Sequence, residues 1–167
     1  FETGEPAKPG ILFKMDASGS VTELGPVATP NGMAFSTDGA VLYLSESGEG
    51  VFTYDVRADG TLENRTQLVA LEDSDGLALD QSGGVWVARY MCNELVCYGA
   101  DGSSKRVLNM PYNSVSSLVF GGDDDRVAGA AFDGLADDGL GVVILRGVDQ
   151  VDAEIERAVH DVDGVRG

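Results

Sequence analysis

The fold is decided by residues 30–55, PNGMAFSTDGAVLYLSESGEGVFTYD. This stretch predicts an Asn-Gly turn followed by three short apolar strands, at Met33–Phe35, Val41–Leu44 and Val51–Tyr54. A polar turn separates the first two strands, and a loop of small and acidic residues separates the second from the third. Short strands joined by tight turns in this way are typical of an antiparallel sheet.

The same order of features returns twice further along the chain. A second copy starts at Asp75, with DGLALDQSGGVWVARYMCNELVCYG, and a weaker third copy starts at Ser116, with SSLVFGGDDDRVAGAAF. In the alignment of the first two copies, Gly32 falls on Gly76. The three copies begin at residues 31, 75 and 116, so the spacings are 44 and 41 residues.

A hairpin completes each copy. It consists of an apolar strand, a turn rich in Asp and Gly, and a more polar strand, and it also precedes the first copy, at residues 10–29. The chain therefore divides into a half unit and three full units of four strands: 10–29, 30–71, 72–111 and 112–159. Within the last unit, Gln150–His160 is also compatible with a short helix, but the repeat favours a strand pair.

A four-stranded unit of about 42 residues is the signature of a β-propeller blade. We therefore predict an all-β fold in which residues 1–167 form a single, partial propeller domain. The first strand of each blade should line the central channel and be covered on both faces. Trp86, in a second strand, should pack between neighbouring blades.

Three and a half blades do not close a ring, because propellers close with typically four to eight blades. The open edges would be able to pair with other strands. Two explanations remain: the chain is the C-terminal part of a longer protein, or two copies form a homodimer that completes one ring. We expect the first.

Composition excludes several classes of partner. The net charge is −17 and the pI is about 4.1, so phosphate backbones and anionic lipid surfaces would be repelled. We therefore expect neither nucleic acid nor membrane as a partner. No signal peptide is visible, and two cysteines, Cys92 and Cys97, are too few for a disulfide framework, so a cytoplasmic location is favoured. The redox state of these cysteines is left open.

Asn31 and Asp75 hold equivalent positions, directly before a glycine and the innermost strand of a blade. Ser116 takes the same place in the third unit. In a propeller these side chains would converge at the mouth of the channel, and their amide, carboxylate and hydroxyl oxygens would suit a hard cation such as Ca²⁺. Asn-Gly and Asp-Gly are also ordinary turn sequences, so spacing alone leaves both interpretations open.

Three stretches together resemble the senescence-marker-protein, gluconolactonase and luciferin-regenerating-enzyme family. They are PNGMAFSTDGAVLYLSESGEGVFTYDVRADGTLENRTQL, DSDGLALDQSGGVWVARY and SVSSLVFGGDDD, and the similarity covers about residues 10–135. The order and spacing of the motifs are similar to those of the C-terminal half of the family. The resemblance implies a six-bladed propeller with one divalent cation in its channel.

The resemblance further implies that Asn31 and Asp75 are metal ligands and that Asp75 is the general base. It implies a metal-dependent hydrolase that opens a sugar lactone or related ester, with Ca²⁺ expected ahead of Zn²⁺, Mn²⁺ or Mg²⁺. The family's glutamate ligand has no counterpart in this sequence, nor has its segment with a further channel Asn and a substrate-contacting Arg. The alternative is a non-catalytic propeller fragment that serves as a binding module or is a truncated remnant.

Overall fold

A computed structural model describes residues 9–110, 114–121, 126–131 and 141–145. The described residues form strands in four antiparallel sheets and contain no helix, so none of them forms a helix able to cross a membrane. The strands are β1 (Gly10–Met15), β2 (Val21–Val27), β3 (Pro30–Phe35), β4 (Val41–Glu46), β5 (Gly50–Val56), β6 (Leu62–Ala70), β7 (Ser74–Leu79), β8 (Val85–Arg89), β9 (Glu94–Tyr98), β10 (Ser104–Asn109), β11 (Val115–Gly121), β12 (Arg126–Ala131) and β13 (Gly141–Leu145).

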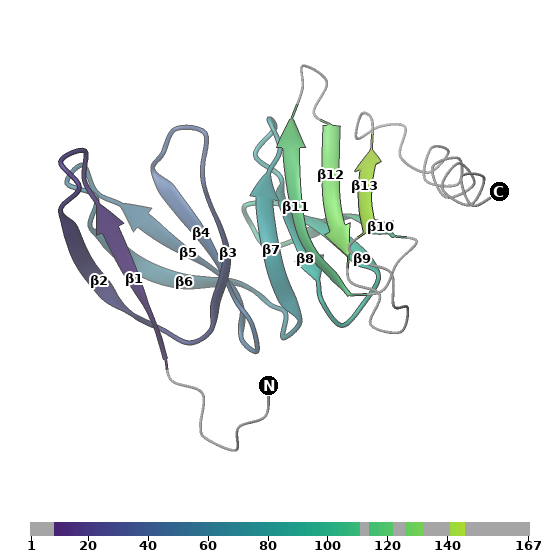
Figure 1. The fold of residues 1–167 in the computed structure, drawn as a ribbon, viewed down its shortest axis with the longest axis horizontal. Coiled ribbons are helices and arrows are strands. Elements are labelled where there is room, and N and C mark those ends of the chain that lie inside the picture. Colours follow the sequence, from purple (N-terminus) through teal and green to yellow (C-terminus); the bar gives the residue numbers. More distant parts are fainter. Residues whose placement is uncertain (1–8, 111–113, 122–125, 132–140, 146–167) are drawn as a thin grey trace.

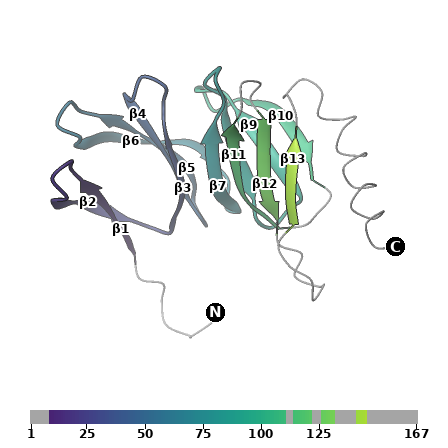
Figure 2. The same cartoon turned by 45° about the horizontal axis from the view of Figure 1, so that its top comes forward.

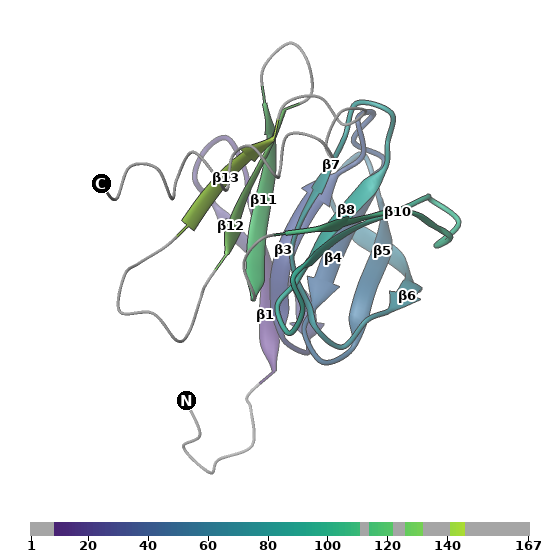
Figure 3. The same cartoon turned by 90° about the vertical axis from the view of Figure 1, so that its right-hand side faces the viewer.

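Each sheet pairs strands that are consecutive in the chain. The sheets are β1-β2, β3-β4-β5-β6, β7-β8-β9-β10 and β11-β12-β13. The sheets follow one another side by side, and their first strands β3, β7 and β11 are neighbours (Figures 1 and 2). Seen from the side, β11, β7 and β3 run next to one another while β6 and β10 lie away from them (Figure 3). This arrangement is a β-propeller of four-stranded blades, as the repeat predicts.

The last predicted unit is described only in part. Strands β11, β12 and β13 form its sheet, and the expected final strand pair, including Gln150–His160, lies outside the described residues. The acidic loop Asp123–Asp125 lies outside them as well.

Aspartates close the hairpin turns. In the turn after β7, Asp80 Oδ1 accepts hydrogen bonds from the Ser82 backbone N at 2.9 Å and from Ser82 Oγ at 2.7 Å. Such bonds favour the ionised carboxylate and lower its pKa. The same kind of turn, with a lowered aspartate pKa in each case, occurs at Asp16, Asp38, Asp59, Asp80 and Asp101. Five of the 28 acidic residues thus serve the turns of a β-rich chain.

Trp86 packs between two blades, which confirms its predicted place. It is 1% exposed, and its ring meets Phe120 of β11 edge-on, with centroids 6.0 Å apart. Its indole Nε1 donates a hydrogen bond to Asp80 Oδ2 at 2.8 Å, so the polar atom of the buried ring is satisfied. The second strands β4 and β8 are buried along most of their length.

The expectation that the first strands are covered on both faces holds for β7 but is wrong for β3 and β11. Met33 and Phe35 of β3 and Val119 of β11 are exposed, whereas Leu77 of β7 and Leu118 of β11 are buried. Successive side chains of a strand point to opposite sides, here towards the preceding and the following blade. Each side is therefore buried only where a neighbouring first strand is present among the described residues.

Candidate functional site

The sequence suggested that the Asn-Gly and Asp-Gly pairs form turns. In the structure they do not. Asn31 lies in β3 and Asp75 in β7, and in both strands the pairing register shifts at this point. The irregularity lies between Pro30 and Met33 in the first blade and between Ser74 and Leu77 in the second. Such a bulge re-aims a side chain at the end of a strand.

The glycines are required by the close approach of neighbouring first strands. A Cβ built on Gly32 would lie 2.6 Å from the carbonyl carbon of Gly76, and one built on Gly76 would lie 2.7 Å from the carbonyl oxygen of Ser116. Real Cβ atoms do not approach other atoms so closely. Glycine therefore lets the first strands of three successive blades pass backbone against backbone.

This approach brings Asn31 and Asp75 together. Both line one cavity of about 320 Å³, and the Asn31 side chain donates a hydrogen bond to the Asp75 carboxylate. The full lining consists of Asn31, Ser47, Glu72, Asp73, Ser74, Asp75, Tyr90 and Met91. Ser116, the third predicted residue, is half-buried in β11 and is not part of this lining.

The pKa of the Asp75 carboxyl is raised above its usual 3.8. The main cause is burial, which disfavours the charged form, and the hydrogen bond from Asn31 acts in the opposite direction. A carboxylate with a raised pKa holds a proton more readily than an exposed one. It also gains more from a nearby positive charge.

Ser47 connects the two blades at the cavity. Its Oγ donates a hydrogen bond to the Ser74 carbonyl oxygen at 2.8 Å and accepts one from Asn31 Nδ2 at 3.4 Å. Because the hydroxyl proton is already used, Ser47 can only accept from Asn31. The contact therefore fixes which end of the Asn31 amide carries the oxygen.

Other polar residues of the cavity were missed by the sequence reasoning. Asp73 is buried, and its Oδ1 accepts a hydrogen bond from Arg89 Nε at 3.0 Å, while Arg89 Nη1 also bonds Glu94 Oε2 at 2.6 Å. Tyr90 follows Arg89 and is half exposed at the rim. The signal was the acidic run EDSD before Gly76, of which only the last residue was singled out.

The cysteines are not bridged. Cys97 is buried in β9 and Cys92 is half-buried in the preceding loop, and both are free thiols. Burial raises the pKa of the Cys97 thiol to about 11. Among the described residues, no three His, Cys, Asp or Glu side chains, thiolate or carboxylate, gather around one point in an arrangement that could hold a metal.

Comparison with known proteins identifies the family. Residues 1–128 match the model of the SMP-30/Gluconolactonase/LRE-like region. The sheets define a β-propeller protein, and its polar cavity lies beside the start of the first strands β3 and β7. Because the match covers most of the chain, the protein belongs to the SMP-30/gluconolactonase/LRE-like family.

Three similar proteins illustrate this relationship. A pentonolactonase from Haloferax volcanii is 33% identical over 144 residues, which cover 78% of this chain and 49% of that protein. A luciferin-regenerating enzyme has a TM-score of 0.74 at 23% identity, with 84% of this chain and 52% of that chain covered. A calcium-binding protein, regucalcin, from Agrobacterium tumefaciens has a TM-score of 0.65 at 23% identity, with 81% and 52% covered. The chain thus spans about half the length of each.

Proposed function

We propose that this protein contributes to the hydrolysis of a sugar lactone or related ester at the cavity beside Asn31 and Asp75. The observation that carries the proposal is the pairing of an amide and a carboxylate of raised pKa in one cavity beside the starts of β3 and β7. The similarity to a pentonolactonase supports the choice of substrate class. In the reaction, water adds to the lactone carbonyl carbon, the ring C–O bond breaks, and a hydroxy acid is released.

We propose that Asn31 and Asp75 supply two oxygen ligands to a divalent cation in this cavity. Asn31 and Asp75 offer an amide oxygen and a carboxylate, and Glu72 and Asp73 add negative charge to the same lining. An all-oxygen donor set suits hard ions, so we propose Ca²⁺, with Mn²⁺, Mg²⁺ and Zn²⁺ as alternatives. The similarity to regucalcin, a calcium-binding protein, supports this choice. When bound, such a cation would polarise the lactone carbonyl and lower the pKa of a bound water.

We assign the role of general base to Asp75. Its pKa is raised by burial, which brings it closer to the range in which a carboxylate both accepts and returns a proton at neutral pH. One oxygen of the Asp75 carboxylate is sufficient to bind the cation, so the other oxygen remains available to accept the proton. Asn31 and Ser47 act in this proposal by fixing the direction of the neighbouring polar groups.

Fewer observations connect Ser116 with the site. It occupies the equivalent position on β11, but it lies outside the lining of the cavity that contains Asn31 and Asp75. We propose it as a channel-lining residue and not as a ligand. The tyrosine at the rim, Tyr90, offers a half-exposed aromatic face beside the same cavity, which suits the C–H face of a sugar ring.

The test is a calorimetric titration of Ca²⁺ and Mn²⁺ into the wild type and Asp75→Asn, together with hydrolysis of a pentonolactone followed by acid release. We expect cation binding to weaken at least tenfold in the variant and turnover to be lost. An Asp101→Asn variant, altered in an exposed turn, serves as the matched control. Unchanged turnover in Asp75→Asn would remove this residue from the base role. Cation binding without turnover would favour a binding module instead.

A further inference from the structure

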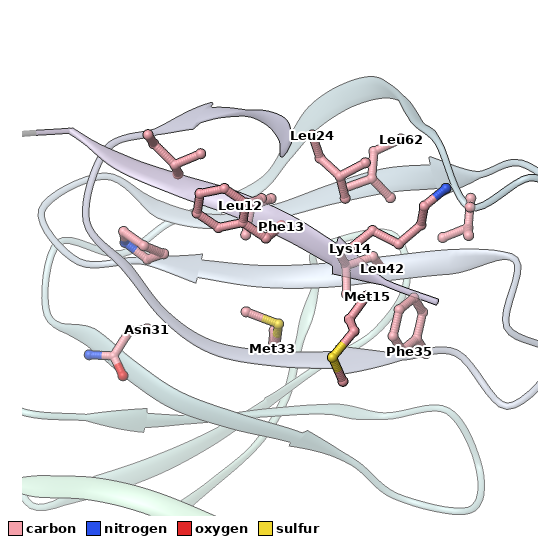
Figure 4. Close-up of a pocket in the computed structure, with 14 residues that line it drawn as sticks. Leu12, Phe13, Lys14, Met15, Leu24, Asn31, Met33, Phe35, Leu42 and Leu62 are labelled. Atoms are coloured by element: carbon pink, nitrogen blue, oxygen red, sulfur yellow. The ribbon is translucent and has the colours of Figure 1, made fainter. Parts of the chain in front are cut away.

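The strand pairing does not fix the two candidate site residues. Figure 4 shows Asn31 at the beginning of β3, with Met33 further along the same strand. The pairing of β3 with β4 is interrupted between Pro30 and Met33, and Asn31 lies inside this interruption. Asp75 lies inside the corresponding interruption of β7. Because neither residue has a partner in the neighbouring second strand, the direction of both side chains depends on other contacts.

In both blades a charged residue ends the second strand beside this interruption. Glu46 is the last residue of β4 and pairs with Pro30, and Arg89 is the last residue of β8 and pairs with Ser74. Each of these partners directly precedes a candidate site residue. Glu46 is fully buried, and the Arg89 side chain is 26% exposed. Two equivalent places in successive blades therefore hold largely buried charges of opposite sign.

The Glu46 carboxylate binds the segment that leads into β3. Its Oε2 accepts a hydrogen bond from the Ala28 backbone N at 2.7 Å, and its Oε1 accepts one from Arg65 Nη2 at 2.9 Å. The backbone N of Ser47, the next residue, donates a hydrogen bond to the Thr29 carbonyl oxygen at 2.9 Å. Two consecutive residues before β3 are thus bound to the end of β4.

Arg89 binds the corresponding segment of the second blade. Its Nε donates a hydrogen bond to Asp73 Oδ1 at 3.0 Å, and its Nη1 donates one to Glu94 Oε2 at 2.6 Å. The backbone N of Tyr90 donates to the Asp73 carbonyl oxygen at 2.9 Å. Asp73 is therefore bound through its side chain and through its backbone, two residues before Asp75.

We propose that Glu46 and Arg89 are positioning residues of the candidate site. Glu46 acts on Asn31 through the connection before β3. Arg89 acts on Asp75 through Asp73. The two ion pairs have the same role with opposite polarity, since the second strand supplies the carboxylate in the first blade and the guanidinium in the second. The inference rests on the proposed function for the second of its two tests and is independent of it for the first.

The chemistry of the two side chains defines variants that disturb their hydrogen bonds with little change of shape. The Arg89 guanidinium binds two carboxylates through a rigid planar fork, which a lysine does not reproduce although it keeps the charge. The Glu46 carboxylate accepts hydrogen bonds through both oxygens, whereas a glutamine amide accepts through one only. Arg89→Lys and Glu46→Gln are therefore the informative substitutions.

The first test uses the side-chain amide NMR signals of Asn31 in the cation-free protein. This amide donates hydrogen bonds to Ser47 in its own blade and to Asp75 in the next, so its signals report on the direction of both candidate site residues. We expect the Asn31 signals to shift in Glu46→Gln and in Arg89→Lys.

Each variant has an internal reference in the other blade. The side-chain amide of Asn93 is hydrogen-bonded within the second blade, and that of Asn64 within the first. The Asn93 signals should stay unchanged in Glu46→Gln, and the Asn64 signals should stay unchanged in Arg89→Lys. This pattern separates a local change of direction from a change of the whole fold.

The second test is the Ca²⁺ affinity measured by calorimetry, with Leu95→Val as the control. Removal of a partner that orients a metal ligand typically reduces affinity 10- to 100-fold, so we expect a loss in this range in Arg89→Lys and in Glu46→Gln. Leu95 is fully buried in β9 and follows Glu94, and its truncation lowers stability in the second blade while both ion pairs stay intact. Leu95→Val should lower the unfolding temperature and leave the affinity and the Asn31 signals unchanged.

Unchanged Asn31 signals in either variant would overturn the inference for that residue and leave its ion pair with a structural role only. An affinity loss of equal size in Leu95→Val and Arg89→Lys would overturn it as well, because reduced stability would then be sufficient to explain the loss. Absence of Ca²⁺ binding in the wild type would contradict the proposed function, and the cation-free NMR signals would still decide whether the two residues position the site.

Discussion

Gly32 and Gly76 meet backbone against backbone, and the Cβ position of Gly32 lies 2.7 Å from the Gly76 Cα. This contact sets the distance between the first strands of two blades. Because Asn31 and Asp75 directly precede these glycines, the same contact sets the distance between the two candidate site residues. Packing of the blades and geometry of the cavity therefore depend on one feature.

Gly76→Ala should destabilise the protein by about 1–3 kcal/mol, the cost of forcing an extra carbon into a packed site. The nearest atoms belong to the backbone of β11, which cannot move aside as a side chain can. Chemical denaturation measures the change. Gly121→Ala is the matched control, because no atom of the described residues lies within 4 Å of its Cβ position and its backbone is not in the left-handed region. Equal stability of the two variants would contradict the close-approach argument.

Asp75→Asn should stabilise the protein at neutral pH when cations are removed with a chelator. Burial raises the folded-state pKa of Asp75, so the folded protein favours its protonated form. The wild type therefore keeps the full contribution of this group below about pH 3.8 and loses it as the pH rises through the folded-state pKa. The gain in the variant should be absent in acid and grow with pH. A gain that is constant with pH would show that charge is not its cause.

Arg65→Ala should cost about 3 kcal/mol, because it leaves a buried carboxylate unpaired. Glu46 is fully buried, and its Oε1 accepts a hydrogen bond from Arg65 Nη2 at 2.9 Å, while its Oε2 accepts one from the Ala28 backbone N at 2.7 Å. Arg65 also lies 3.5 Å from the centre of the Phe52 ring. Thermal unfolding checks the prediction.

The control for Arg65 is a surface ion pair of the same type. Arg57 pairs with Glu63, and both side chains are largely exposed, at 60% and 44%. Solvent screens such a pair, so Arg57→Ala should leave the unfolding temperature almost unchanged. If both arginine variants lose the same stability, burial of Glu46 is not the reason.

The repeat was sufficient to predict the sheets because each blade has the same strand and turn pattern. The Asp-rich turns and the place of Trp86 followed from residue types whose local chemistry is strong. The role of Gly32 and Gly76 did not follow, because a glycine required by close approach and one required by a turn look the same in sequence. Exposure of Met33 and Phe35 could not be predicted either, since it depends on which neighbouring strands are present.

The site was predictable only in part for a similar reason. Asn31 and Asp75 stood out because they occupy equivalent positions in two repeats. Ser47 did not stand out, because it bridges two blades through side-chain hydrogen bonds that are not part of the repeat. The place of Asp73 in the cavity could not be predicted, because its ion-pair partner Arg89 lies sixteen residues away in the sequence.

The contribution of Ser47 can be separated from that of the residues it orients. Ser47→Ala removes one acceptor for Asn31 Nδ2 and the donor to the Ser74 carbonyl, so the Asn31 amide is oriented only by its hydrogen bond to Asp75. Loss of such an orienting contact typically reduces metal affinity 10- to 100-fold. We therefore expect weaker Ca²⁺ binding in calorimetry with little change in stability, and recovery in Ser47→Thr, which keeps the hydroxyl.

Ser45→Ala is the control: its buried Oγ has no hydrogen-bond partner in the described part of the chain, so affinity should be unchanged. Equal affinity in Ser47→Ala and Ser45→Ala would mean that the Asn31 amide is oriented without Ser47 or takes no part in binding the cation.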